Sequence, residues 1–107
     1  MIGIYVRSAN KDDGQMKKQL NECYKLIKNE PVKEYVDIGE KGFQNNFPVA
    51  FQELNVDIGK GLIKKVICHS PDRISRNKTD IQMFVLHCQR NGVDLQFVDG
   101  TNVMMLL

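Results

Sequence analysis

The chain has 107 residues, of which 42% are hydrophobic and 26% are charged, and its formal net charge is +2. This length and composition predict a single globular domain with its own core, and the small net charge does not by itself indicate a nucleic-acid partner. No segment approaches the roughly 18 consecutive apolar residues of a membrane span, and the chain begins in a strand pattern instead of a secretory leader. We therefore expect a cytoplasmic protein with no membrane partner.

Strand and helix patterns alternate from the N-terminus. An apolar run predicts a strand at 2–7, and apolar residues at helical spacing predict a helix over 13–29. A second strand is predicted at 32–37, after which a polar loop leads to Pro48, a residue that suits the first turn of a helix. We expect this second helix to end at Gly59.

The second half of the chain repeats the alternation. The most hydrophobic run predicts a third strand at 62–69, Thr79 is placed to cap a helix that ends near Asn91, and a fourth strand is predicted at 93–98. Parallel neighbouring strands need crossover connections of this kind. The pattern therefore predicts an α/β fold, with a mostly parallel sheet of four to five strands covered by helices on both faces.

The segment 70–76 after the third strand carries the clearest indication of a site. It places Arg73 and Arg76 in a short loop, and Arg7 ends the first strand with Ser8 beside it. Arginine presents a planar fork of donors that matches phosphate oxygens. Because ligands of parallel sheets bind at the carboxyl ends of the strands, we expect these groups to converge on a phosphate.

Cations are concentrated near this loop. Residues 60–78 include six lysines or arginines and a single acidic residue, Asp72. We expect a basic region around the arginines and a polyanionic partner. The alternatives are a solvated face for the charge run and a simple loop salt bridge for Asp72 with Arg73 and Arg76.

Motifs for cofactors and metals are lacking. Neither a Gly-x-Gly-x-x-Gly turn nor a Walker-type loop follows the first strand, and Arg7 stands where a phosphoacceptor receiver domain would need an acidic residue. His69 has no companion ligands, and the three cysteines are widely spaced without a Cys-x-x-Cys pair. We expect no small-molecule cofactor, no metal, and buried reduced thiols.

One set of residues along the chain forms a combined pattern: Tyr5-Val6-Arg7-Ser8, Gln19, Asp37 with Gly39 and Gly42, Asp72-Arg73-Ile74-Ser75-Arg76, and Gly92 to Val98. Together these residues resemble the N-terminal catalytic domain of serine recombinases, the resolvases and invertases. That resemblance implies site-specific DNA recombination without a metal or a high-energy cofactor: a serine hydroxyl attacks a backbone phosphodiester, forms a phosphoserine linkage and releases a 3′ hydroxyl. It also implies that Arg7, Gln19, Arg73 and Arg76 bind DNA phosphate and that Asp72 orients the arginines. The resemblance covers nearly the whole chain.

The chain departs from the family pattern at two positions. Where the family has its serine, two residues after the arginine of the first strand, this chain has Ala9, and the nearby hydroxyl belongs to Ser8. Because successive strand residues face opposite sides, Ser8 can serve as the nucleophile only if the strand ends in a turn or bulge by residue 8. An arginine that usually precedes the proline of the second helix is Phe47 here.

The resemblance also concerns the C-terminal end. Serine recombinases continue into a long helix used for dimer and tetramer assembly and then into a DNA-binding region, and we expect residues 1–107 to form one catalytic domain without either. The apolar tail 103–107 is predicted to begin that helix or to form a last strand, with Met104 and Met105 as packing residues. We expect double-stranded DNA as the partner and a homo-oligomer in the longer protein.

Three functional hypotheses follow from these observations. The first is an active recombinase domain that uses Ser8 in a shifted register. The second is a catalytically inactive relative that binds DNA phosphate or a recombinase partner. The third is a plain α/β interaction module in which the arginines have a structural role.

Overall fold

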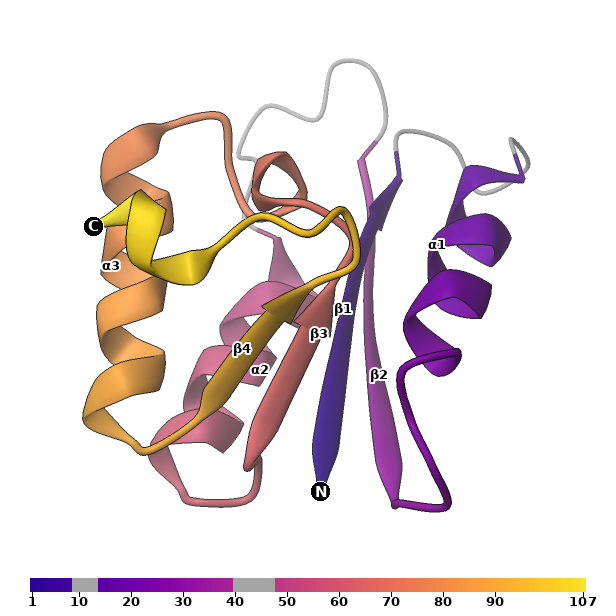
Figure 1. The fold of residues 1–107 in the computed structure, drawn as a ribbon, viewed down its shortest axis with the longest axis horizontal. Coiled ribbons are helices and arrows are strands. Elements are labelled where there is room, and N and C mark those ends of the chain that lie inside the picture. The colour runs from indigo at the N-terminus through magenta and orange to yellow at the C-terminus, as the bar shows by residue number, and fades with distance from the viewer. Residues whose placement is uncertain (9–13, 40–47) are drawn as a thin grey trace.

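Four parallel strands form one sheet in the order β2-β1-β3-β4. The computed structural model describes residues 1–8, 14–39 and 48–107, and Figure 1 shows their arrangement. The predicted α/β fold with a parallel sheet is confirmed. In chain order the elements are β1 (Ile2–Ser8), α1 (Gln15–Tyr24), β2 (Val32–Ile38), α2 (Val49–Gly59), β3 (Lys65–Cys68), the 3-10 helix η1 (Pro71–Arg73), α3 (Lys78–Arg90), β4 (Asp94–Phe97) and the 3-10 helix η2 (Val103–Leu106).

The sheet carries a hydrophobic core on each face, because successive strand residues point to opposite sides. Ile4 and Val6 of β1 pack with Cys23 of α1 on one face. Tyr5 packs with residues of α2 and α3, among them Phe84, on the other. Helices therefore cover both faces, as predicted, with α1 on one side and α2 and α3 on the other (Figure 1).

Three elements are shorter than predicted: α1, β3 and, by one residue at each end, β4. The helix α1 ends at Tyr24, and the N–H groups of Leu26 and Ile27 donate to carbonyls only three residues back, which tightens the chain into a turn. The strand β3 begins at Lys65 because that residue pairs with Ile2, the first residue of β1, so the preceding apolar residues have no partner strand beside them.

The helix α3 is capped by Asn77 and not by Thr79. The Asn77 side-chain oxygen accepts hydrogen bonds from the N–H groups of Thr79 at 2.8 Å and Asp80 at 3.4 Å. These two groups are among the first N–H donors of the helix, which have no partner within it. The predicted cap was wrong because Thr79 already lies in the first turn.

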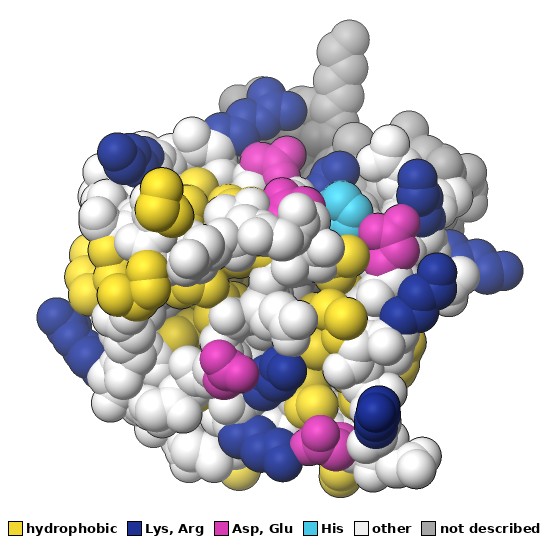
Figure 2. Space-filling view, viewed as in Figure 1, with side chains coloured by type: hydrophobic (Ala, Val, Ile, Leu, Met, Phe, Trp, Pro, Cys, Tyr) yellow, Lys and Arg dark blue, Asp and Glu magenta, His cyan; other side chains and the backbone are white. Residues whose placement is uncertain are grey.

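The C-terminal segment forms η2, a four-residue 3-10 helix, and not the strand that was one of the two predictions for it. Residues three apart share one side of a 3-10 helix, so Val103 and Leu106 both pack against the core beside α3. Met104 and Met105 are 68% and 80% exposed, so the expectation that they pack was wrong. Figure 2 shows hydrophobic side chains gathered over this part of the molecule.

All three cysteines are buried and free, as predicted. Burial raises the pKa of the Cys23 thiol to about 11 and that of the Cys68 and Cys88 thiols to about 12. Within the part of the chain that the structure describes, no helix is long and apolar enough to cross a membrane.

Candidate functional site

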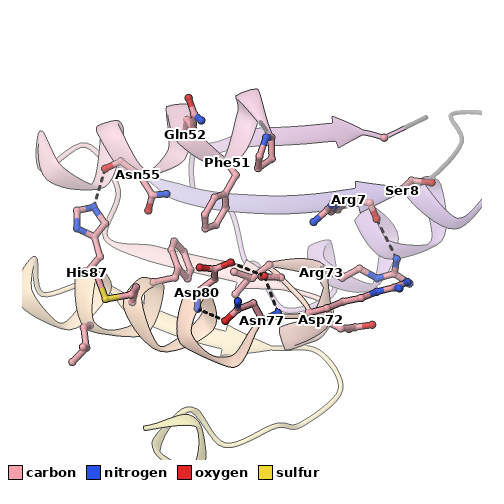
Figure 3. A pocket seen from close by; sticks show the side chains of 18 of the residues that line it. Arg7, Ser8, Phe51, Gln52, Asn55, Asp72, Arg73, Asn77, Asp80 and His87 are labelled. Atoms are coloured by element: carbon pink, nitrogen blue, oxygen red, sulfur yellow. Dashed lines mark hydrogen bonds between the residues drawn. The ribbon is translucent and has the colours of Figure 1, made fainter. Parts of the chain in front are cut away.

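The predicted convergence of arginines occurs at the carboxyl edge of the sheet. Arg7 is the penultimate residue of β1, and Arg73 ends η1, the turn that follows β3. Nη1 of the Arg73 guanidinium group donates to the main-chain carbonyl of Arg7 at 3.3 Å, as Figure 3 shows. Arg76 is exposed and lines the same groove as these two residues.

This groove runs between α2 and α3 and opens onto the arginines. Figure 3 shows Phe51 and Asn55 projecting from α2 toward α3, whereas Gln52 points away. At the far end His87 Nε2 donates to the Asn55 carbonyl at 2.9 Å and joins the two helices. Two aromatic side chains, Phe51 and Phe84, line the groove, and their ring centroids lie 5.0 Å apart.

Two serine hydroxyl groups form hydrogen bonds at the ends of the arginine loop, residues 70–76. The Ser70 hydroxyl donates to the Asp72 carboxylate at the start of the loop, and the Ser75 hydroxyl donates to Asp80 at 3.1 Å near its end. Among the residues that the structure describes, no ion pair joins Asp72 to Arg73 or Arg76. The alternative loop salt bridge is therefore not formed among the described residues. The orientation of the arginines by Asp72 stays a prediction.

Tyr5 and Asp37 tie the sheet edge to α2. The buried Tyr5 hydroxyl donates to the Asp37 carboxylate at 2.7 Å, and that carboxylate accepts from the N–H groups of Ala50 at 2.8 Å and Phe51 at 3.0 Å. Burial, followed by the bond to Asp37, raises the pKa of Tyr5 far above its usual range. A carboxylate from β2 thus caps α2 and fixes the wall of the groove.

This cap was missed by the sequence reasoning. Asp37 lies thirteen residues before the N–H group of Ala50 that it accepts from, outside the local spacing by which caps are recognised. The one signal in the sequence is an acidic residue near the end of a predicted strand, and Asp37 is named above only as part of the resemblance.

Ser8 remains part of the regular strand. It pairs with Ile38 of β2, its carbonyl accepts from the Gly39 N–H at 2.9 Å, and it is only 1% exposed. The strand pairing of β1 is regular through residue 8, and Ser8 lines the groove together with Arg7. The role of Ser8 as nucleophile stays a prediction. Ala9 and Phe47, the two departures from the family pattern, lie outside the described residues.

Gln19 lies beneath the site and not in the groove. Its side-chain N–H donates to the Arg7 carbonyl at 3.1 Å, the residue is 4% exposed, and it is absent from the groove lining. The predicted phosphate contact of Gln19 has no support in this geometry. Nη2 of Arg73 donates to the side-chain oxygen of Gln15, which also lies in α1, at 3.4 Å.

The cations of residues 60–78 do not form one basic region. Lys60, Lys64 and Lys65 lie before or at the start of β3, whereas Arg73 and Arg76 follow its end. A four-residue strand places these two groups about 13 Å or more apart, and Figure 2 shows lysines and arginines spread over the visible face. That prediction was wrong because these residues, although close in sequence, lie beyond opposite ends of β3.

Groups suited to a metal are not found in the described part of the chain, where no three His, Cys, Asp or Glu side chains come together. His69 lies at the carboxyl end of β3, with its Nε2 3.0 Å from the Glu22 carboxylate of α1.

The chain matches the family described as Resolvase, N terminal domain, over residues 2–105. It is 33% identical over 104 residues to the "Putative DNA recombinase" of Bacillus subtilis (strain 168). That match covers 94% of this chain but only 21% of the relative, so the chain spans about a fifth of the length of the relative.

Solved structures share the fold. The N-terminal catalytic domain of TP901-1 integrase superposes with a TM-score of 0.77 at 24% identity, over 92% of this chain and 77% of that one. The C-terminal catalytic domain of ISC1926 TnpA, an IS607-like serine recombinase, gives a TM-score of 0.75 at 22% identity, over 97% and 74% of the two chains. The first ORF in transposon ISC1904 from Sulfolobus solfataricus P2 gives 0.76 at 19% identity, over 94% and 69%.

Proposed function

Because the chain belongs to the family of resolvase N-terminal domains, we propose that it acts in site-specific DNA recombination, as the domain that holds the phosphodiester at which strands are cut and rejoined. The observation that carries this proposal is the placement of Arg7, Arg73 and Arg76 along one groove at the carboxyl edge of the sheet. The third hypothesis, a plain interaction module, gives no reason for arginines that form no ion pair among the described residues.

The chemistry of strand cleavage accounts for the arginines. Attack on a phosphodiester builds up negative charge in the transition state, and a well-placed donor to such charge is typically worth about 3 kcal/mol. In the proposed step the Ser8 Oγ–phosphorus bond forms and the bond from phosphorus to the 3′ oxygen breaks. The serine hydroxyl gives up its proton, and the departing 3′ oxygen takes one.

Ser8 requires a local opening before it can act. Its backbone bond to the Gly39 N–H and its pairing with Ile38 would have to break so that the hydroxyl could turn toward Arg7. Only the last pair of the β1–β2 ladder is affected, so this opening is confined to the strand end.

The strand pairing of Ser8 supports a second candidate function, that of a domain which binds DNA without cutting it. With alanine at position 9 and Ser8 buried in regular pairing, the domain would bind DNA phosphate without cutting it and would act with a recombinase partner. Under both candidates the partner is double-stranded DNA, and we propose that the longer protein assembles as a homo-oligomer.

The phosphate site is tested by the affinity for a duplex DNA fragment over a range of salt concentrations. Arg76→Ala should weaken binding and lower the salt slope by about one, because one phosphate contact is lost. Lys60→Ala removes the same charge at the opposite edge of the sheet and is the matched control. Equal effects of the two substitutions would show that only overall charge matters.

Cleavage is tested with a pool of DNA duplexes in which sulfur replaces the bridging 3′ oxygen. Cleavage then releases a 3′ thiol that does not attack the phosphoserine linkage, so the covalent adduct accumulates. The active candidate predicts a covalent adduct at Ser8, detected by mass spectrometry and abolished in Ser8→Ala. Binding without any adduct would favour the second candidate.

A further inference from the structure

One main-chain carbonyl at the site receives donors from two separate elements. The Arg7 carbonyl accepts from the Gln19 side chain of α1 at 3.1 Å and from Arg73 of η1 at 3.3 Å. A carbonyl oxygen has two lone pairs and can satisfy both donors. This oxygen therefore joins α1, β1 and the arginine loop at the residue whose own side chain lines the groove.

The bonds of Arg73 are the weaker part of this arrangement. Its contacts to the Arg7 carbonyl and to Gln15 are 3.3 and 3.4 Å long, and its buried Nε has no hydrogen-bond partner among the described residues. Arginine binds a phosphate through shorter, charge-assisted bonds that are about twice as strong as neutral ones. A phosphate in the groove would therefore draw the guanidinium away from the Arg7 carbonyl.

Gln19 is placed to keep its hydrogen bond to the Arg7 carbonyl when phosphate binds. It is 4% exposed and does not line the groove, so a ligand there does not compete for its amide. Its Oε1 is buried without a partner in the described part of the chain, which leaves the bond to Arg7 as the polar contact that the structure shows for this side chain. A buried amide with one unsatisfied atom costs stability. A role of Gln19 in holding the Arg7 carbonyl therefore explains this side chain better than a contribution to stability does.

We propose that Gln19 is a positioning residue of the phosphate site, which holds the Arg7 carbonyl in place when Arg73 leaves it to bind phosphate. The inference rests on the proposed function, since it assumes that phosphate binds at these arginines. Gln19 itself does not touch the phosphate. Its effect passes through the end of β1, where it fixes the direction of the Arg7 side chain and of the neighbouring Ser8.

The test is a titration of the protein with inorganic phosphate, followed by NMR, in a double-mutant cycle with Arg7. Gln19→Leu removes the donor and should weaken phosphate binding about fivefold, the equivalent of one net hydrogen bond. In an Arg7→Ala background the same substitution should have no further effect. Hydrogen exchange at the Gly39 N–H, which reports the end of β1, should become faster in Gln19→Leu.

Two further variants separate positioning from general destabilisation. Gln19→Glu keeps the shape of the side chain while replacing the donor with an oxygen, and it should weaken binding at least as much as Gln19→Leu. Asn21→Leu makes the same kind of change at an exposed position of α1 and should leave phosphate binding unchanged.

The outcomes distinguish this inference from the proposed function. The inference would be overturned if phosphate affinity were unchanged in Gln19→Leu and Gln19→Glu, or if Gln19→Leu lowered it equally with and without Arg7. If Arg76→Ala still weakened phosphate binding in that case, the proposed phosphate site would stand. Phosphate binding that is insensitive to Arg76→Ala would overturn both.

Discussion

Replacing Asp37 with alanine is expected to destabilise the domain through three contacts at once. The carboxylate accepts from the N–H groups of Ala50 and Phe51 and from the Tyr5 hydroxyl. Loss of a helix N-cap costs about 1–2 kcal/mol. The Tyr5 side chain is 1% exposed, so its hydroxyl would be left buried without an acceptor, which adds about 1–3 kcal/mol. We therefore expect Asp37→Ala to lower the free energy of unfolding by about 2–5 kcal/mol.

Urea unfolding of a double-mutant cycle tests this expectation. Tyr5→Phe removes the hydroxyl and leaves Asp37 with its two N–H donors, so it should cost only about 0.5–1.5 kcal/mol. In the double variant no unsatisfied hydroxyl remains, and the combined loss should be smaller than the sum by about 1 kcal/mol or more. Asp37→Asn, which keeps one accepting oxygen, should fall between wild type and Asp37→Ala. Strictly additive losses, or an Asp37→Ala variant as stable as wild type, would refute the reasoning.

Three further outcomes are expected. Asn77→Ala should lower stability by about 1 kcal/mol through loss of the α3 cap, and Thr79→Ala by clearly less; the reverse order in urea unfolding would contradict the assigned cap. Hydrogen bonds from Tyr35 and then Lys33 hold the pKa of Asp57 below its usual value, so its contribution is present above about pH 4 and is lost on further acidification. Asp57→Asn should flatten this acid dependence of the unfolding free energy, and an unchanged pH profile would count against it. The three buried thiols should react with a thiol reagent at pH 8 only as fast as the protein opens, whereas rapid labelling of the native protein would be inconsistent with their burial.

Local sequence patterns were sufficient for the fold and for the placement of the arginine loop. The apolar runs that became β1 and β3 are followed directly by Arg7 and by η1, and parallel pairing alone brings those ends together. The features that sequence reasoning missed depend on contacts between distant residues. Asp37 caps a helix that begins well beyond it, and Gln19 reaches a carbonyl of the preceding strand.

Errors in the sequence reasoning came from treating neighbours in sequence as neighbours in space. Lys60 and Arg76 belong to one cationic stretch of the sequence, but β3 runs between them and places them beyond its opposite ends. Met104 and Met105 were expected to pack because the tail is apolar, but a 3-10 turn directs only Val103 and Leu106 inward.

The most direct test of the central claim is a crystal structure of the domain grown or soaked with phosphate. We expect an anion at the carboxyl edge of the sheet, within hydrogen-bond distance of the guanidinium groups of Arg7 and Arg76, with Arg73 turned from the Arg7 carbonyl toward the anion. An anion bound instead beside Lys60 and Lys64, or Arg73 still on the carbonyl with the groove empty at saturating phosphate, would contradict it.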